Sequence, residues 1–445
     1  MGQRMFPERS IQQLLLATAP DSLGLRHPVR IPQCSRVTEQ RTRLTFRWER
    51  WRAVTAGILE SAGSTFLLLI AVRWFDAGAS AKALVAAGGS VGLLLSPLVV
   101  SGVASLGWPV AVAASRLAMV GSGCFLWTAL VPILPVFVVG SVLAMACSAA
   151  VIPLMTQIYQ ENYPATDRGR LFSRTMIIRI AVAAGFSQLA GSAMSGSNIA
   201  HFRWLLLGFA VAYAFGSYCL SRCPSQPLTV AGGTHPFRAM RYVREDRLFR
   251  WTLGAWMLMG FANLMMLPLR VEYLANPRYG LALDVSLVAL LVGVIPNLAR
   301  LVMSPIWGQL FDRMNFFSLR VMVNFGFAVG IVSFFTSHDT PGLVFGAIVF
   351  GISNAGGDVA WSLWVTKFAP PERVADYMSV HTFFTGVRGV VAPAVAFHLI
   401  GTLPMATLGW ISAALIGGSM LMLLTEVKWG RTGRPGTVLT EEVSE

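Results

Sequence analysis

The sequence predicts an all-α polytopic membrane protein with about twelve transmembrane helices, arranged as two six-helix repeats. Composition, the spacing of long apolar runs and an internal duplication all support this fold class. Of the 445 residues, 55% are hydrophobic and only 13% are charged, and the mean hydropathy is +0.61. A soluble domain carries about a quarter charged residues. The composition therefore excludes a disordered protein, a coiled coil and an ordinary cytosolic enzyme.

Twelve stretches of the chain are long and apolar enough to cross a bilayer, which takes about 20 residues. They cover 54–74, 82–103, 108–130, 134–156, 172–195, 203–221, 251–271, 283–308, 319–337, 341–366, 378–400 and 404–425. We therefore predict five parts: an Arg-rich tail (1–50), a six-helix bundle (51–221), a middle loop (222–250), a second bundle (251–426) and a polar tail (427–445).

Basic residues are distributed unevenly between the two sides of the predicted spans. With both termini inside, 27 Lys and Arg residues fall on the inner side and five on the outer side. The positive-inside rule then predicts that both termini are cytoplasmic. An Arg-, Ala- and Gly-rich composition favours a bacterial inner membrane. The net charge of +14 follows from this topology and from attraction to anionic lipid, so no nucleic-acid partner is expected.

The two halves of the chain repeat one another. At an offset of 197 residues, eight positions meet identical or similar residues, among them the pairs Gly57 and Gly254, Gly63 and Gly260, and Arg73 and Arg270. Later echoes pair Ser96-Pro97 with Ser304-Pro305 and Pro164 with Pro370. Parallel repeats of this kind suit a carrier whose substrate site lies between the halves, near the membrane midplane.

Short loop motifs follow the same spacing. The run from Gly308 to Arg313, continuing to Arg320, looks like the G-x-L-x-D-R loop of the major facilitator superfamily. The runs 163–170 and 370–373 look like that family's P-x-x-x-R-G and P-P-E-R loops. With the six-plus-six spans, the chain resembles this family over about 50–426. The resemblance implies rocking of two halves, with gating roles for Gly308, Asp312, Arg313, Arg320, Arg168 and Arg373.

The sequence also departs from that family's pattern at two places. The first-half counterpart of the Asp-Arg loop, residues 100–105, has lost both charges, which leaves the first-half latch in doubt. Span five lacks the G-x-x-x-G-P-x-x-G-G pattern of many drug/proton antiporters. A drug exporter is therefore a weaker expectation than the fold.

Five ionisable residues stand out within predicted spans, because a charge near the bilayer centre costs roughly 2.5–3.5 kcal/mol to insert. They are Glu60, Arg179, Arg300, Asp358 and Arg388. Helical spacing places polar neighbours beside some of them, and in the resembled fold these spans face the central cavity. Arginine suits an anionic group. We expect substrate binding by Arg300, Arg388, Asn297, Asn354 and Trp361, and proton coupling by Asp358 and Glu60.

A purely structural role is the alternative for these charges. Glu60 with Arg179, and Asp358 with either Arg388 or Arg300, are expected to form interhelical ion pairs if they only hold the bundle together. For the Glu60 and Arg179 pair we favour this structural interpretation. His381, near a predicted cytoplasmic end, is expected to be a satisfied interfacial histidine.

These patterns favour a secondary-active transporter of a small solute, anionic and proton-coupled, that works by alternating access. A non-transporting relative with an assembly or sensing role is the alternative, and a drug or lipid exporter is a weaker one. An enzyme is not expected, because the G-x-S-x-G match at 88–92 lies within an apolar run. The expected partners are a small-molecule substrate, the lipid bilayer and protons. No cofactor or metal is expected, and the protein is expected to be a monomer.

Overall fold

The computed structural model describes residues 33–164, 167–228, 237, 240–367, 369 and 374–429, and the described residues from 41 onward form one compact unit. Regular structure in these residues is helical, and the β interaction found there is an isolated bridge between Pro109 and Pro227. Twelve helices of the described part are long and apolar enough to cross a bilayer, which confirms the predicted number. The chain is thus an all-α integral membrane protein.

The first six spans are built from eight consecutive helical segments. These are α2 (Gln33–Ser61), the π-helix η1 (Ala62–Phe66), α3 (Leu67–Arg73), α4 (Ala79–Leu106), α5 (Val110–Leu130), α6 (Leu134–Asn162), α7 (Arg168–Ala193) and α8 (Phe202–Ser221), with a 3-10 turn η2 (Gly196–His201) before α8. Helix α2 begins well before the predicted residue 54. Its added turns make polar contacts: Thr42 Oγ1 donates to Asn162 O at 2.7 Å, and the buried Glu49 pairs with Arg52 at 2.6 Å.

The last six spans follow a short helix, α9 (Arg241–Glu245). They are α10 (Arg247–Ala275), α11 (Val285–Ala289) with the π-helix η5 (Leu290–Val294) and α12 (Ile295–Arg313), α13 (Phe316–Thr336), α14 (Thr340–Leu363), α15 (Val374–Leu399) and α16 (Met405–Trp429), with 3-10 turns η4 (Pro277–Tyr279) and η6 (Trp364–Lys367). Polar side chains cap the N-termini of several of these helices. Asp246 accepts from Phe249 N at the start of α10, and Asn315 accepts from Phe317 N at the start of α13.

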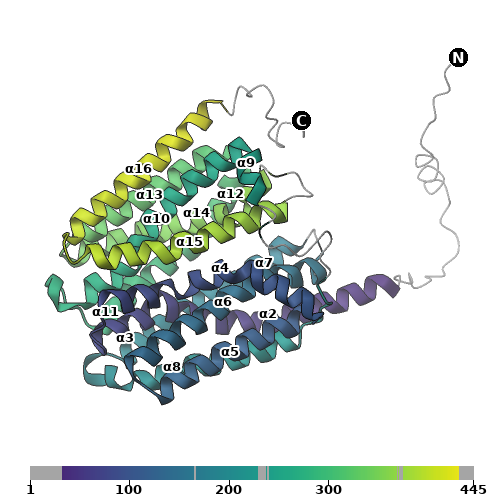
Figure 1. Cartoon of the computed structure of the whole chain (residues 1–445), viewed down its shortest axis with the longest axis horizontal. Helices are drawn as coiled ribbons and strands as arrows, with labels where there is room; N and C mark the ends of the chain where they lie inside the picture. The colour runs from purple at the N-terminus through teal and green to yellow at the C-terminus, as the bar shows by residue number, and fades with distance from the viewer. Residues whose placement is uncertain are drawn as a thin grey trace, which may run out of the picture. The chain divides into compact units, whose positions relative to one another are not determined.

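Helices from the same half of the chain pack closely on one another. Helix α5 packs on α6 and α8, and α4 packs on α6; in the second half α13 packs on α14 and α16, and α12 packs on α14. Figure 1 shows α10 and α12–α16 gathered on one side and α4–α8 on the other. Contacts between the halves run along α4 with α15, and from α7 to α11, η5 and α12.

Two π-helical turns interrupt spans one and eight at the place where these spans meet. The turns η1 and η5 contact each other, and Gly293 of η5 lies so close to Ser187 of α7 that a side chain there would clash. A π turn inserts one extra residue into a helix and re-aims the residues beside it, and it is frequent at functional sites. The two turns therefore draw attention to the polar side chains next to them.

Candidate functional site

Four charged side chains from four different spans form one connected network. Glu60 lies at the end of α2, just before the π turn η1, and Arg300 lies on α12, a few residues after the π turn η5. Arg300 Nη1 lies 2.6 Å from Glu60 Oε1, and Arg300 Nε lies 2.5 Å from Asp358 Oδ2 on α14. Arg179 Nε on α7 lies 2.6 Å from the other oxygen of Glu60. The order of the network is Arg179, Glu60, Arg300, Asp358.

The sequence prediction that these residues form ion pairs is confirmed for two of the proposed pairs. Glu60 pairs with Arg179, and Asp358 pairs with Arg300 rather than with Arg388. The link between Glu60 and Arg300 was missed, although it joins the two halves of the chain. Sequence spacing gives no signal for it, because the two residues are 240 positions apart and meet only through helix packing.

The network carries no net formal charge and is most deeply buried at its centre. The side chain of Arg300 is 8% exposed and that of Glu60 is 17% exposed, whereas Arg179 and Asp358 are 39% and 41% exposed. A buried ion pair offsets part of the large cost of removing two charges from water, and breaking it leaves that cost uncompensated. The two outer members, in contrast, are partly screened by solvent.

The other residues expected to bind substrate lie near this network. Asn297 is one turn from Arg300 on α12, and its Oδ1 lies 3.5 Å from Arg300 Nη1. Asn354 and Trp361 lie on α14, one turn before and one turn after Asp358, and both side chains are half-buried. These positions follow from the helical spacing that the sequence already showed.

Arg388 is not part of the network. Its Nη1 donates to the backbone oxygen of Trp256 on α10 at 2.5 Å, and its side chain covers Gly260 of the same helix. Arg320 on α13 reaches the same tryptophan, with its Cζ 3.5 Å from the ring centroid. His381 lacks the hydrogen bonds expected of a satisfied histidine: the side chain is fully buried and neither ring nitrogen has a hydrogen-bond partner. Its ring packs among tryptophans instead, because α10 and α14 flank α15.

The residues expected to act in gating are spread over several helix ends. Gly308 and Arg313 lie in the last turns of α12, and Arg313 is exposed. Arg320 is buried, at 2% exposure, rather than in a loop. Asp312 and Arg168 lie at helix ends, but their side chains are outside the described residues, as is the whole of Arg373.

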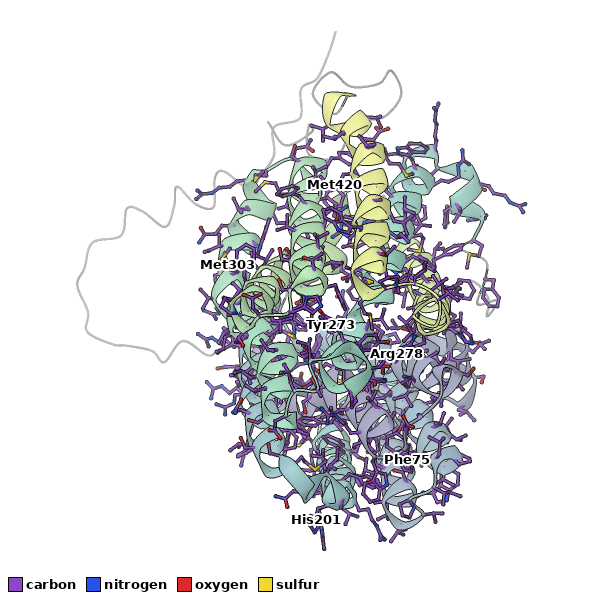
Figure 2. The ribbon with its side chains drawn as sticks, turned by 90° about the vertical axis from the view of Figure 1, so that its left-hand side faces the viewer. Phe75, His201, Tyr273, Arg278, Met303 and Met420 are labelled. Atoms are coloured by element: carbon purple, nitrogen blue, oxygen red, sulfur yellow. The ribbon has the colours of Figure 1, made fainter. Side chains whose placement is uncertain are left out.

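A second set of contacts between the halves was not predicted from the sequence. Lys82 at the start of α4 forms a buried ion pair with Glu272 of α10 at 2.7 Å, and Asn276 Nδ2 also donates to Glu272 at 2.9 Å. Arg73 Nη2 donates to Leu283 O at 2.7 Å. Figure 2 shows the neighbouring Tyr273 and Arg278 near the middle of its view. The sequence signal for the Lys82–Glu272 contact was an acidic residue, Glu272, near the end of the apolar run 265–275.

Asp284 belongs to the same group of contacts, at the start of α11. Its Oδ1 accepts from Gly196 N at 3.1 Å and its Oδ2 accepts from Ser286 N at 3.0 Å. A hydrogen bond with the Ser195 side chain, together with these backbone donors, holds the pKa of Asp284 below its ordinary value. All these contacts lie at the end of the helices that the basic-residue distribution predicts to be outer. Across the described residues, no group of three or more His, Cys, Asp or Glu side chains is placed to hold a metal ion.

Comparisons with known proteins agree on the architecture. The sequence profile of the Major Facilitator Superfamily matches residues 111–393. A comparison with curated proteins finds no match.

Several solved transporters share the fold at low sequence identity. A mutant form of the nucleoside transporter NupG is 12% identical, with a TM-score of 0.71 over 86% of this chain and 99% of that one. The xylose transporter XylE from E. coli is 16% identical, with a TM-score of 0.59 over 88% and 97%. The human organic anion transporter MFSD10 is 13% identical, with a TM-score of 0.62 over 86% and 99%. At these identities the likeness establishes the fold.

Proposed function

This chain belongs to the major facilitator superfamily, and we propose that it is a secondary-active transporter of a small anionic solute, coupled to protons. Residues 51–221 and 251–426 would act as the two halves that rock around a central site. The observation that carries this proposal is the network from Arg179 to Asp358, because its central ion pair joins Glu60 of one half to Arg300 of the other.

The network gives a physical route from protonation to a change in contacts. Arg300 holds two carboxylates at once, and Asp358 is the more exposed of the two. When Asp358 takes up a proton it loses its charge, and Arg300 Nε then lacks an anionic partner. A substrate carboxylate can take that place near Asn297, Asn354 and Trp361, and its binding is thereby linked to the proton. Loss of the proton restores the original ion pair and favours release.

The excess of basic residues supports the proposed orientation. The 27 inner and five outer Lys and Arg residues support a bacterial inner membrane with both termini in the cytoplasm. In the same proposal Asp312, Arg313, Gly308, Arg320, Arg168 and Arg373 lie on the cytoplasmic side and control closure there, and the protein works as a monomer.

Flux into proteoliposomes tests this function. Vesicles that hold a pH-sensitive dye receive acetate, lactate, benzoate or phosphate under an imposed pH gradient. We expect at least one anion to acidify the lumen in a saturable manner beyond the leak of protein-free vesicles. Asp358→Asn should abolish the dependence on the pH gradient, and Arg300→Gln should abolish flux. Arg278→Gln, at an exposed position outside the network, is the control. Anion flux that does not depend on the imposed pH gradient would refute coupling. Absence of flux for every anion would favour the assembly or sensing alternative.

A further inference from the structure

Two buried basic side chains and the half-buried Arg388 gather around one tryptophan in the second half of the chain. Arg388 of α15 donates to Trp256 O, and the guanidinium of Arg320 on α13 stacks on the Trp256 ring at 3.5 Å. His381 lies about two turns before Arg388 on α15, and its ring centroid is 5.3 Å from that of Trp256. Arg320, His381 and Trp256 are 2%, 0% and 4% exposed. We call these four residues the cationic cluster.

The cationic cluster has no carboxylate partner, unlike the network around Arg300. In the part of the chain that the structure describes, no acidic side chain pairs with any of its members, and Arg320 and Arg388 both contact Trp256. An isolated buried charge is costly, and a second like charge beside it adds to that cost. Cation–π stacking on Trp256 offsets only about 2 kcal/mol. The arrangement is therefore complementary to a negative charge that none of the described residues supplies.

The cluster also presents several hydrogen-bond donors without acceptors. Arg320 Nη1, Arg388 Nε and Trp256 Nε1 are buried and unpartnered, as are both ring nitrogens of His381. Arginine and indole nitrogens can only donate, so a ligand that satisfies them must offer oxygen acceptors. A guanidinium matches the plane and spacing of a carboxylate.

We propose that the cationic cluster is a binding site for a planar carboxylate, held between Arg320 and Arg388. The role of this site in transport rests on the proposed function: the cluster would hold the substrate carboxylate while Arg300 is still paired with Asp358. Arg300 holds two carboxylates of the protein, whereas no carboxylate among the described residues pairs with the cluster.

The cluster is connected to the network through one residue. The Trp361 ring lies 5.8 Å from that of His381, and Trp361 is one turn from Asp358 on α14. A negative charge bound at the cluster lies beside His381, whose ring contacts that of Trp361. It disfavours a second negative charge at Asp358, which is the direction that symport of a proton and an anion requires.

Thermal unfolding of the detergent-purified protein tests the site without any need for transport. Sodium benzoate is the probe, benzamide is its neutral isostere, and sodium chloride matches the ionic strength. Benzoate is expected to raise the melting temperature in a saturable way, whereas benzamide and chloride are not. Arg320→Gln and Arg388→Gln should each weaken benzoate binding by roughly 30-fold or more, as expected when one partner of a buried charge pair is removed.

The chain provides a matched control. Arg270 is also a buried arginine of the second half, with its Cζ 3.9 Å from the centroid of the Phe350 ring. Arg270→Gln should leave benzoate binding unchanged. Without ligand, Arg320→Gln and Arg388→Gln should unfold at the same temperature as the wild type or higher, because each relieves repulsion; residues with a purely structural role would lower it. Arg388→Lys keeps the charge and the fold and should bind benzoate more weakly than the wild type.

The outcomes separate this inference from the proposed function. Absence of saturable stabilisation by benzoate, or equal stabilisation of the wild type and both glutamine variants, overturns the site even if the protein transports anions. Benzoate binding that is lost in those variants supports the site even if no flux is found, and in that case the transport proposal alone fails.

Discussion

Arg300 occupies an unusual position, because one side chain of 8% exposure pairs with carboxylates from two other helices. Its contact with Glu60 is the more deeply buried of the two, since the Glu60 side chain is 17% exposed and that of Asp358 is 41% exposed. The larger energetic contribution is therefore expected from Glu60, where solvent screens the charges less.

We predict that Arg300→Gln destabilises the protein by about 3 kcal/mol, because Glu60 keeps only its partly exposed partner Arg179. The double variant Glu60→Gln with Arg300→Gln should lose less than the sum of the two single changes. Chemical unfolding of the four proteins in detergent gives this coupling energy. Strict additivity would show that the pair contributes nothing to stability.

A second prediction at this scale concerns Asp284, which lies outside the spans. Since the pKa of Asp284 is lower in the folded protein than the value of about 3.9 in unstructured peptides, its carboxylate stabilises the fold above pH 4. That contribution is lost as the pH falls through the folded pKa. Asn caps a helix as well as Asp but does not titrate. The melting temperature of Asp284→Asn should therefore fall less than that of the wild type between pH 7 and pH 3. An equal fall would contradict a lowered pKa for Asp284 in the folded protein.

At the scale of elements, glycines decide how closely α4 and α15 approach. A Cβ at Gly386 would meet the α4 backbone at Leu94, and a Cβ at Gly389 would meet Ser90. These helices come from different halves of the chain, so small residues here allow contact between the halves. Ser90 of the G-x-S-x-G match at 88–92 lies on this surface of α4, whereas Gly88 and Gly92 face α6. The match lies within a helix rather than at a strand–helix turn.

Gly386→Ala is predicted to destabilise the protein by about 1–3 kcal/mol, since added volume in a packed contact forces the helices apart. Gly417→Ala on α16 is the matched control, because nothing lies within 4 Å of its added methyl group. That change should be neutral or stabilising by up to about 1 kcal/mol through helix propensity. Melting temperatures of the two variants compare them directly, and equal shifts would count against a close α4–α15 contact.

At the scale of the whole molecule, the contacts at the predicted outer end hold the two halves together. Lys82 pairs with Glu272, and Arg73 donates to Leu283 O. Ser187 of α7 is fully buried against Gly293 of η5, where the two halves of the chain meet. An alternating-access cycle requires that such contacts open and close. The buried ion pair between Lys82 and Glu272 is therefore expected to favour the closed arrangement.

We predict that the double variant Lys82→Met with Glu272→Gln opens this end more often. A thiol at Ser187→Cys, in a chain without its five native cysteines, should react with a membrane-impermeant reagent about tenfold faster in the double variant. That ratio corresponds to ~1.4 kcal/mol. Arg278→Gln, an exposed change at the same end, should leave the rate unaltered. An unchanged rate in the double variant would show that this ion pair does not hold the two halves closed.

The sequence by itself determined the fold class and the number of spans, because bilayer thickness sets the length of an apolar run and apolar periodicity is local. It also identified Glu60, Arg300 and Asp358 as charged residues inside apolar spans, where their insertion cost indicates a specific role. Only the tertiary structure decided which charges meet. Arg300 pairs with Glu60, 240 positions away in the sequence. Arg388 donates a hydrogen bond to Trp256 O, and His381 is buried. Spacing along one helix fixes which side chains share a face, but helix packing, here adjusted by two π turns, fixes what that face contacts.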